Sequence, residues 1–287
     1  MPPIRLILTA LLAVLTMSAV PVLVKSVAAN EVTIGLFRLT VALLVFLPFV
    51  YAGRDSRAPL SRSDWRGLLL IGLVFGVHWL TYFLSIKWST AAIASVAIAT
   101  YGVQYPVLAW LLQGERLTLV DGGAIAMSLV GCVMVAPALE WQDRMTWGIA
   151  VGIFSALLYA LLPILHQRLR QVSTVQRTSG QFGFALLVFI PLWPYSNWDL
   201  SADDFLRLLT LGLLCTVVAH GLWVKVTTEL PAIFTSLIYY LYVPLAMLSS
   251  AVFLEEPIGP LKVAGATLII ASSMVATAWR WRLSRAQ

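Results

Sequence analysis

Apolar blocks of membrane-spanning length dominate this sequence and are separated by short polar segments. About 20 residues of α-helix cross the hydrocarbon core of a bilayer, and blocks of that length place ten helices along the chain. They lie near residues 5–27, 31–52, 66–87, 90–113, 119–137, 146–168, 175–193, 204–226, 231–253 and 259–280. Only 11% of the residues are charged, against roughly 25% in soluble domains. We therefore expect an all-α membrane protein with ten transmembrane helices.

The first apolar block has a second interpretation. The segment "MPPIR", the apolar run after it and "SVAAN" together resemble a signal peptide with a small-residue cleavage site. However, "PVLVK" at residues 21–25 of this block is matched by "PILHQ" at residues 163–167. A leader that is removed has no reason to resemble a later helix, so we expect the first block to be a retained helix.

The chain contains a tandem repeat. The string "ALLVFLP" at residues 42–48 recurs as "ALLVFIP" at residues 185–191, which is 143 positions later. Further matches follow in the same order at separations of 141 or 142 residues: His78 with His220, Ser95 with Ser236, Tyr101 with Tyr242, and Glu115 with Glu256. We divide the chain at this period into residues 1–142 and 143–287, with five predicted helices in each part.

Five is an odd number, so the second repeat enters the membrane from the opposite side and the two five-helix repeats are inverted. Inverted repeats are typical of secondary transporters, whose substrate site lies near the bilayer midplane where the halves meet. Two similar halves can exchange conformations, which gives inward-open and outward-open states of comparable energy. A single chain supplies both halves, so a monomer is sufficient.

Basic residues predict the orientation, because Lys and Arg crowd the cytoplasmic side of membrane proteins. With the amino terminus inside, thirteen of the nineteen Lys and Arg lie at cytoplasmic helix ends. They are Arg5, Arg54, Arg57, Arg62, Arg66, Arg116, Arg168, Arg170, Arg177, Lys225, Arg280, Arg282 and Arg285. We expect a multi-pass protein of a bacterial-type inner membrane with both termini cytoplasmic. Topology and lipid headgroups then explain the net charge of +6, and we expect no nucleic-acid partner.

The ionisable residues predicted inside the membrane are basic or neutral. All thirteen Asp and Glu fall in loops or near helix ends, whereas Arg38, His78 and His220 fall within helices. An ionisable group at that depth is costly and usually functional, and these groups suit a substrate that carries a carboxylate. The structural alternatives are that Arg38 pairs with backbone carbonyls or with Gln181, and that both histidines serve packing.

Polar and aromatic residues at helical spacing extend this candidate site. Residues three or four apart share a helix face, and an aromatic lining with a few polar groups suits a small-molecule pocket. The predicted substrate-binding residues are Arg38, His78, Tyr82, Tyr101, Gln104, His220, Trp223, Ser236, Tyr239 and Tyr240. The alternative for the Tyr and Trp residues is an interfacial aromatic belt. Within the transporter interpretation, we expect Tyr101→Ala to weaken transport while leaving folding intact.

Prolines within helices recur at corresponding places in the two halves. Proline removes a backbone hydrogen bond and kinks a helix. The predicted hinges are Pro21 with Pro163 and Pro106 with Pro244. Such kinks would let each half flex, although static packing bends explain the same pattern.

Other chemistry has no support in the sequence. The cysteines Cys132 and Cys215 stand alone in predicted helices, so neither a disulfide framework nor a CxxC metal site is indicated. No glycine-rich phosphate loop is present. We expect no cofactor, no metal and no enzyme activity.

Long segments of the chain match a family pattern. They are "FRLTVALLVFLP" around Arg38, "YFLSIKWSTAAIASV" from Tyr82 to Val96, and "YPVLAWLLQGERLTLVDGGAIAMSLVG" from Tyr105 to Gly131. A second copy of the last one reads "VPLAMLSSAVFLEEPIGPLKVAGATLII". These segments resemble the EamA-like transporters of the drug/metabolite transporter superfamily, and the histidines and aromatics look most like the YddG-type amino-acid exporters.

The resemblance implies a fold of ten helices in two repeats and export of amino acids or similar small metabolites. It covers essentially the whole chain. Small multidrug-resistance relatives export cations by means of a buried membrane glutamate, which this sequence does not provide, so that kind of antiport is disfavoured. The alternatives are an exporter of other drugs or metabolites, or a non-transporting receptor or assembly factor on the same scaffold.

Overall fold

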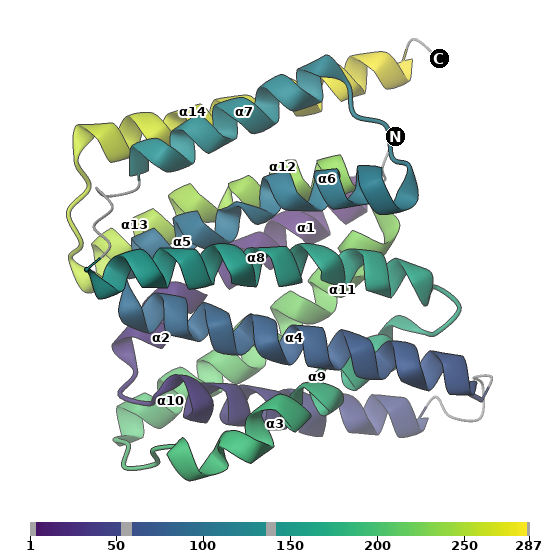
Figure 1. The fold of residues 1–287 in the computed structure, drawn as a ribbon, viewed down its shortest axis with the longest axis vertical. Helices are drawn as coiled ribbons and strands as arrows, with labels where there is room; N and C mark the ends of the chain where they lie inside the picture. The colour runs from purple at the N-terminus through teal and green to yellow at the C-terminus, as the bar shows by residue number, and fades with distance from the viewer. Residues whose placement is uncertain (1–3, 53–58, 136–141, 286–287) are drawn as a thin grey trace.

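The computed structural model describes residues 4–52, 59–135 and 142–285, and every regular element in these ranges is helical (Figure 1). The first part of the chain forms α1 (Ile4–Met17), α2 (Val20–Ser26), α3 (Glu31–Ala52), α4 (Arg62–Trp88), α5 (Ala91–Ala99), α6 (Tyr101–Gln113) and α7 (Leu119–Val135). The second part forms α8 (Arg144–Arg168), α9 (Thr174–Phe189), the 3₁₀ helix η1 (Ile190–Tyr195), α10 (Ala202–Gly212), the π-helix η2 (Leu213–Val218), α11 (Ala219–Glu229), α12 (Ala232–Tyr240), α13 (Tyr242–Leu254) and α14 (Pro260–Arg285). The all-α prediction is confirmed for the described residues.

Seven helical segments of the described chain are long and apolar enough to cross a membrane. They are Ile4–Ser26, Glu31–Ala52, Arg62–Trp88, Ala91–Gln113, Arg144–Arg168, Ala202–Glu229 and Ala232–Leu254. Two shorter apolar helices, Leu119–Met134 and Pro260–Ser272, accompany them. Arg54, Asp55, Arg57 and Glu140, which entered the predictions above, lie outside the described residues. The chain is thus a multi-pass membrane protein.

Two spans are interrupted at corresponding positions of the two halves. The break between α5 and α6 falls at Thr100, and the break between α12 and α13 falls at Leu241. At both, the backbone N–H bonds to the carbonyl three residues earlier, Thr100 to Ala97 at 3.3 Å and Leu241 to Ile238 at 3.1 Å. A tight turn of this kind narrows the helix locally, so the two spans are discontinuous at matching places.

The predicted hinge prolines differ in whether a break in the helix lies near them. Pro106 and Pro244 follow the two breaks just described, and Pro21 follows the turn that separates α1 from α2. Pro163, in contrast, lies inside α8, which runs without interruption from Arg144 to Arg168. The continuous helix around Pro163 favours the static alternative for that residue. Pro21 and Pro244 lie within three residues of a break, whereas Pro106 lies inside α6, six residues after Thr100.

Corresponding helices of the two halves lie side by side. α5 contacts α13 while α6 contacts α12, so the first part of each span meets the second part of the other, as in an antiparallel pair. α3 contacts α9, and α7 packs along α14 as a separate layer (Figure 1). α1 begins and α14 ends on the same side of the bundle, called the termini end below (Figure 1). This arrangement is what a pseudo-two-fold axis through the middle of the bundle requires.

Two glutamates from the repeated segments join the halves. Glu256, just after α13, accepts hydrogen bonds from the backbone N–H groups of Ala91 at 3.3 Å and Ala92 at 3.4 Å. Glu115, just after α6, accepts one from the N–H of Ala232 at 3.2 Å. Each carboxylate therefore sits at the N-terminus of a helix in the other half, where the helix dipole favours negative charge. The Glu115 and Glu256 match in the sequence reflects a reciprocal helix cap.

The turns that carry these glutamates have the same backbone conformation. Gly114 has φ 71° and Glu255 has φ 55°, both left-handed, each directly before its capping glutamate. Glycine adopts this conformation without a steric cost, whereas a residue with a Cβ does not. Glu255 thus adopts the left-handed conformation that a glycine, Gly114, adopts in the corresponding turn of the first half.

Candidate functional site

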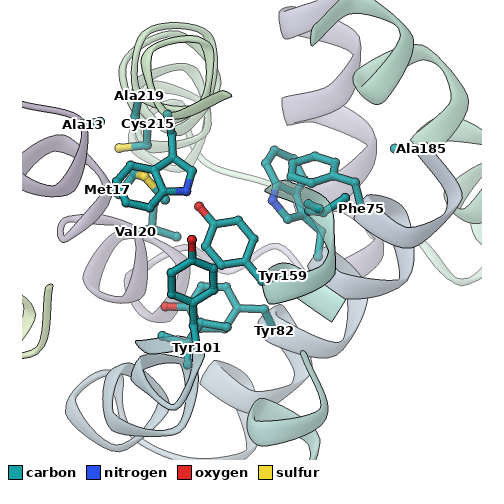
Figure 2. Packing of buried hydrophobic residues seen from close by; sticks show 14 of the residues in the cluster. Ala13, Met17, Val20, Phe75, Tyr82, Tyr101, Tyr159, Ala185, Cys215 and Ala219 are labelled. Carbon is teal, nitrogen blue, oxygen red and sulfur yellow. The ribbon is translucent and has the colours of Figure 1, made fainter. Parts of the chain in front are cut away.

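A small cavity lies in the middle of the bundle, enclosed by helices from both halves of the chain. Its walls are formed by Met17, Val20, Arg38, His78, Trp79, Tyr82, Phe83, Ile98, Tyr159, His220, Tyr239 and Tyr242. The cavity measures about 20 Å³, which is room for about one water molecule. Figure 2 shows the rings of Tyr82, Tyr101 and Tyr159 gathered beside Met17 and Val20. The bundle is therefore closed around its polar centre.

Arg38 of α3 is a buried cation on the wall of this cavity. Its Nε donates to Thr216 Oγ1 at 2.9 Å, and its Nη2 donates to the Cys215 carbonyl at 3.4 Å. The guanidinium carbon lies 4.1 Å from the ring centroid of Trp79, a cation–π distance. The remaining nitrogen, Nη1, is buried without a hydrogen-bond partner. Arg38 thus has one donor group left for a ligand.

No carboxylate compensates Arg38 in the part of the chain that the structure describes. The one ion pair found there joins Arg207 to Asp204, near the start of α10. Gln181, the predicted partner across the axis, instead has its Oε1 2.7 Å from Nε2 of His166. The backbone-carbonyl alternative for Arg38 is therefore confirmed by the Cys215 bond, and the Gln181 alternative is not.

The partners of Arg38 come from the π-helical turn η2. Thr216 Oγ1 accepts from Arg38 and donates to the Leu211 carbonyl, five residues earlier, at 2.7 Å. A π-turn widens the backbone ring and leaves carbonyls free of their usual helical bonds, and such turns are frequent at functional sites. The widened turn is what presents the Cys215 carbonyl and the Thr216 hydroxyl to a side chain of the other half.

His78 of α4 combines packing with a polar role. Its Nδ1 lies 2.8 Å from Ser155 Oγ and 3.0 Å from the Ser155 carbonyl, while Ser155 Oγ donates to the His78 carbonyl at 2.7 Å. Because the serine proton is used in that last bond, Nδ1 carries a proton, and in a neutral ring Nε2 is then an acceptor. The ring stacks on Tyr159 at a centroid distance of 4.5 Å.

Tyrosine hydroxyls and rings complete the wall. Tyr82 and Tyr242, from different halves, place their hydroxyl oxygens 2.5 Å apart. Tyr239 stacks on Tyr242 with an interplanar angle of 5°. His220 is surrounded by rings, with Phe75 at 5.4 Å and Trp79 at 5.5 Å. Of the predicted site residues, the structure brings Arg38, His78, Tyr82, His220 and Tyr239 to the cavity.

Two predicted residues lie directly behind the wall. Tyr101 is fully buried, 4.6 Å from the Tyr239 ring and 5.0 Å from the Tyr159 ring. Trp223 packs against Tyr239 at 5.5 Å and borders a second void of about 10 Å³. Complete burial of Tyr101 argues against the expectation that Tyr101→Ala leaves folding intact, because large-to-small changes in cores cost about 3–5 kcal/mol.

Three predicted residues lie away from the cavity. Gln104 donates to Thr100 Oγ1 at 3.3 Å and to the Ile153 carbonyl at 3.4 Å. The Ser236 hydroxyl is buried outside the cavity wall. Tyr240 packs over Gly102 in a separate cluster with Ala92 and Val243. Consecutive residues of a helix point about 100° apart, so Tyr239 and Tyr240 cannot share one face.

Several residues on the wall or directly behind it were not predicted from the sequence. Trp79, Tyr159, Tyr242, Cys215 and Thr216 all contact Arg38, His78 or Tyr82. Tyr242 carried a usable signal, since it is the repeat partner of Tyr101. The π-turn carries no comparable signal, because its sequence "LLCTVV" reads as ordinary apolar helix.

Side-chain hydrogen bonds tie neighbouring helices together at both ends of the bundle. At the end opposite the termini, Lys25 donates to the Ser89 carbonyl at 2.5 Å and Lys87 donates to the Val27 carbonyl at 2.7 Å, which ties α2 to the end of α4. At the termini end, Gln167 donates to the Thr227 carbonyl at 2.7 Å and Arg170 to the Thr228 carbonyl at 2.8 Å, which ties α8 to the end of α11. Lys25 and Gln167 are repeat equivalents, so the two closures are related.

The comparison with solved structures supports this fold. One crystal structure, described only as that of a protein, aligns with this chain at a TM-score of 0.79 and 19% sequence identity. The alignment covers 97% of this chain and 98% of the chain in that structure. At that identity the likeness concerns the fold.

Curated relatives cover most of the chain. An uncharacterized transporter, YxxF, of Bacillus subtilis (strain 168) is 24% identical over 73% of this chain and 69% of its own length. An uncharacterized transporter of Archaeoglobus fulgidus is 27% identical over 77% of both chains, and the inner membrane protein YtfF of Escherichia coli (strain K12) is 26% identical over 44% of this chain and 43% of its own. The model of the EamA-like transporter family matches residues 4–136 and again residues 146–278. On these matches, which span both halves and include the cavity, the chain belongs to the EamA-like transporter family.

Proposed function

We propose that the protein is a secondary transporter that exports amino acids or similar small carboxylate-bearing metabolites by alternating access. The observation that carries this proposal is Arg38, a buried cation with a free Nη1 on the wall of a central cavity built from both halves of the chain. An ionisable group at membrane depth without a protein counter-ion is a functional-site candidate. A substrate carboxylate supplies the missing charge.

The proposed architecture has ten crossings in two inverted five-helix repeats, residues 1–142 and 143–287. The antiparallel pairing of α5–α6 with α12–α13 supports the inversion. The basic residues at the termini end, among them Arg62, Arg66 and Arg168, support a cytoplasmic location for both termini. We assign the protein to a bacterial-type inner membrane, acting as a monomer without cofactor, metal or catalytic step.

The hydrogen bonds at the two ends of the bundle support an alternating-access mechanism. Loss of the Lys25 and Lys87 bonds would open the end opposite the termini, and loss of the Gln167 and Arg170 bonds would open the termini end. Each set joins a helix that flanks the cavity to its neighbour, so a substrate could reach Arg38 from one side at a time.

Counterflow into proteoliposomes tests the proposal. Purified protein is reconstituted with unlabelled threonine, methionine or phenylalanine inside, and uptake of the labelled amino acid is followed. We expect saturable uptake of at least one compound above protein-free vesicles. Absence of uptake for the whole set would refute the transporter assignment for this substrate class and favour a receptor or assembly role.

A further inference from the structure

The central cavity carries one fixed positive charge and no negative one. We infer that its preferred ligand is a monocarboxylate anion with an apolar or aromatic body and no ammonium group, the deaminated counterpart of a neutral amino acid. This inference rests on the proposed transport function and narrows its substrate class. Three features of the cavity carry it: its net charge, the occupied face of Trp79 and the chemistry of its walls.

The net charge favours an anion over a zwitterion. Among the described residues, the cavity wall contains Arg38 and no Asp or Glu. The hydrogen bonds of His78 place a proton on Nδ1, so this ring adds no negative charge. The described carboxylates that make protein contacts lie at helix ends, such as Glu256 at the start of α5 and Asp204 at the start of α10. A monoanion therefore neutralises the buried site, whereas a zwitterion leaves it with a net charge of about +1 in a low-dielectric setting.

The best cation–π surface of the wall is unavailable to an ammonium group, because the Arg38 guanidinium covers the Trp79 face. An ammonium group would have to rely on the remaining acceptors, such as the Tyr159 hydroxyl, which is buried without a partner. These acceptors are neutral, so they do not offset the added positive charge.

A carboxylate, in contrast, can accept a hydrogen bond from a free donor on the wall. Nη1 of Arg38 is buried and unpartnered, and Nη2 makes only a long bond of 3.4 Å to Cys215. These two nitrogens form one edge of the guanidinium, which matches the two oxygens of a carboxylate. Binding would exchange the weak Nη2 bond for a charge-assisted pair without disturbing the 2.9 Å bond from Nε to Thr216.

The rest of the wall suits an apolar body. Met17, Val20, Ile98 and Phe83 provide aliphatic and aromatic surface, and Tyr159 and Tyr239 offer ring faces. The present volume of about 20 Å³ is too small for such a molecule, so the aromatic side chains must move apart when the cavity opens. Rings that separate in this way would then cover the two sides of the ligand body.

The test compares matched ligand pairs that differ only in the ammonium group. The pairs are phenylalanine with 3-phenylpropionate, leucine with 4-methylpentanoate, and methionine with 4-(methylthio)butanoate. Binding to the purified full-length protein in detergent is measured by calorimetry and by ligand-induced thermal stabilisation, because weak acids leak through bilayers in their neutral form. Arg38→Gln is measured alongside Arg207→Gln, which removes a partly exposed arginine at the start of α10.

We expect the deaminated ligand of at least one pair to bind at least about tenfold more tightly than its amino acid, since a second cation close to the guanidinium is repelled. Arg38→Gln should abolish this preference and Arg207→Gln should retain it. Equal or tighter binding of the amino acids would overturn the inference, and so would equal stabilisation by chloride at the same concentration or no binding in any pair. If Arg38→Gln does not fold, the wild-type comparison decides alone. Counterflow of amino acids with no binding of the deaminated ligands would overturn this inference while leaving the transporter assignment in place.

Discussion

Thr216→Val tests whether the π-turn holds Arg38 in place. Valine has the shape of threonine without the hydroxyl, so the change removes the acceptor of Arg38 Nε and the donor to the Leu211 carbonyl. A buried donor left without a partner costs about 1–3 kcal/mol, and a bond to a charged group is at the upper part of the range. Thr216→Ser keeps both bonds and loses one buried methyl, at about 0.8 kcal/mol.

We therefore expect Thr216→Val to be less stable than Thr216→Ser by about 2 kcal/mol, after the methyl term is taken into account. The assay is reversible unfolding in mixed detergent micelles, followed by tryptophan fluorescence. Ligand binding is measured for both variants to show whether the substitution has changed the conformation of the site. Equal stability of the two variants would refute the reasoning, because it would mean that the Arg38–Thr216 bond contributes nothing to the closed state.

Four further perturbations follow from the contacts above. Glu115→Gln and Glu256→Gln should each lower the free energy of unfolding by about 0.3–1 kcal/mol, because each removes negative charge from a helix N-terminus. Glu229→Gln, at an exposed helix end, should leave it unchanged. Equal effects of all three variants would contradict the reciprocal cap. Gly131→Ala places a Cβ 2.6 Å from the Gly265 carbonyl and should cost about 1–3 kcal/mol. Gly123→Ala on the same helix meets open space and should leave the free energy of unfolding unchanged or raise it by up to about 1 kcal/mol in the same assay. Tyr101→Ala should lose stability, while Tyr101→Phe should keep the fold and transport; a stable Tyr101→Ala would argue against the packing of that ring. Lys87→Met should speed labelling of Val27→Cys by a membrane-impermeant thiol reagent, because the bond to the Val27 carbonyl is lost, and an unchanged rate would show that this bond does not keep the end closed.

The helical architecture could be predicted because membrane length and repeated letters are both visible in the sequence. The match of Glu115 with Glu256 located two turns that prove to be structurally equivalent. The match of Tyr101 with Tyr242 also located related positions, but one ring lies behind the wall and the other on it. Sequence periodicity identifies which residues correspond, and packing decides which of them reach the cavity.

The site was predicted only in part. Arg38, His78 and His220 stood out because ionisable groups within apolar helices are rare, and all three line the cavity. Gln104 and Tyr240 were assigned from spacing alone, and the structure places them on other faces of their helices. The partners of Arg38 depend on a π-turn that involves no distinctive residue, so Cys215 and Thr216 could only be found in three dimensions.

The most direct test of the account is a comparison of proteoliposome counterflow by the wild type, Arg38→Gln and Arg207→Gln at matched reconstitution levels. The account predicts saturable flux of a carboxylate-bearing substrate by the wild type and by Arg207→Gln, and loss of that flux in Arg38→Gln while the protein still purifies as a folded monomer. Flux by Arg38→Gln at the wild-type rate would contradict the claim that the buried guanidinium binds the substrate.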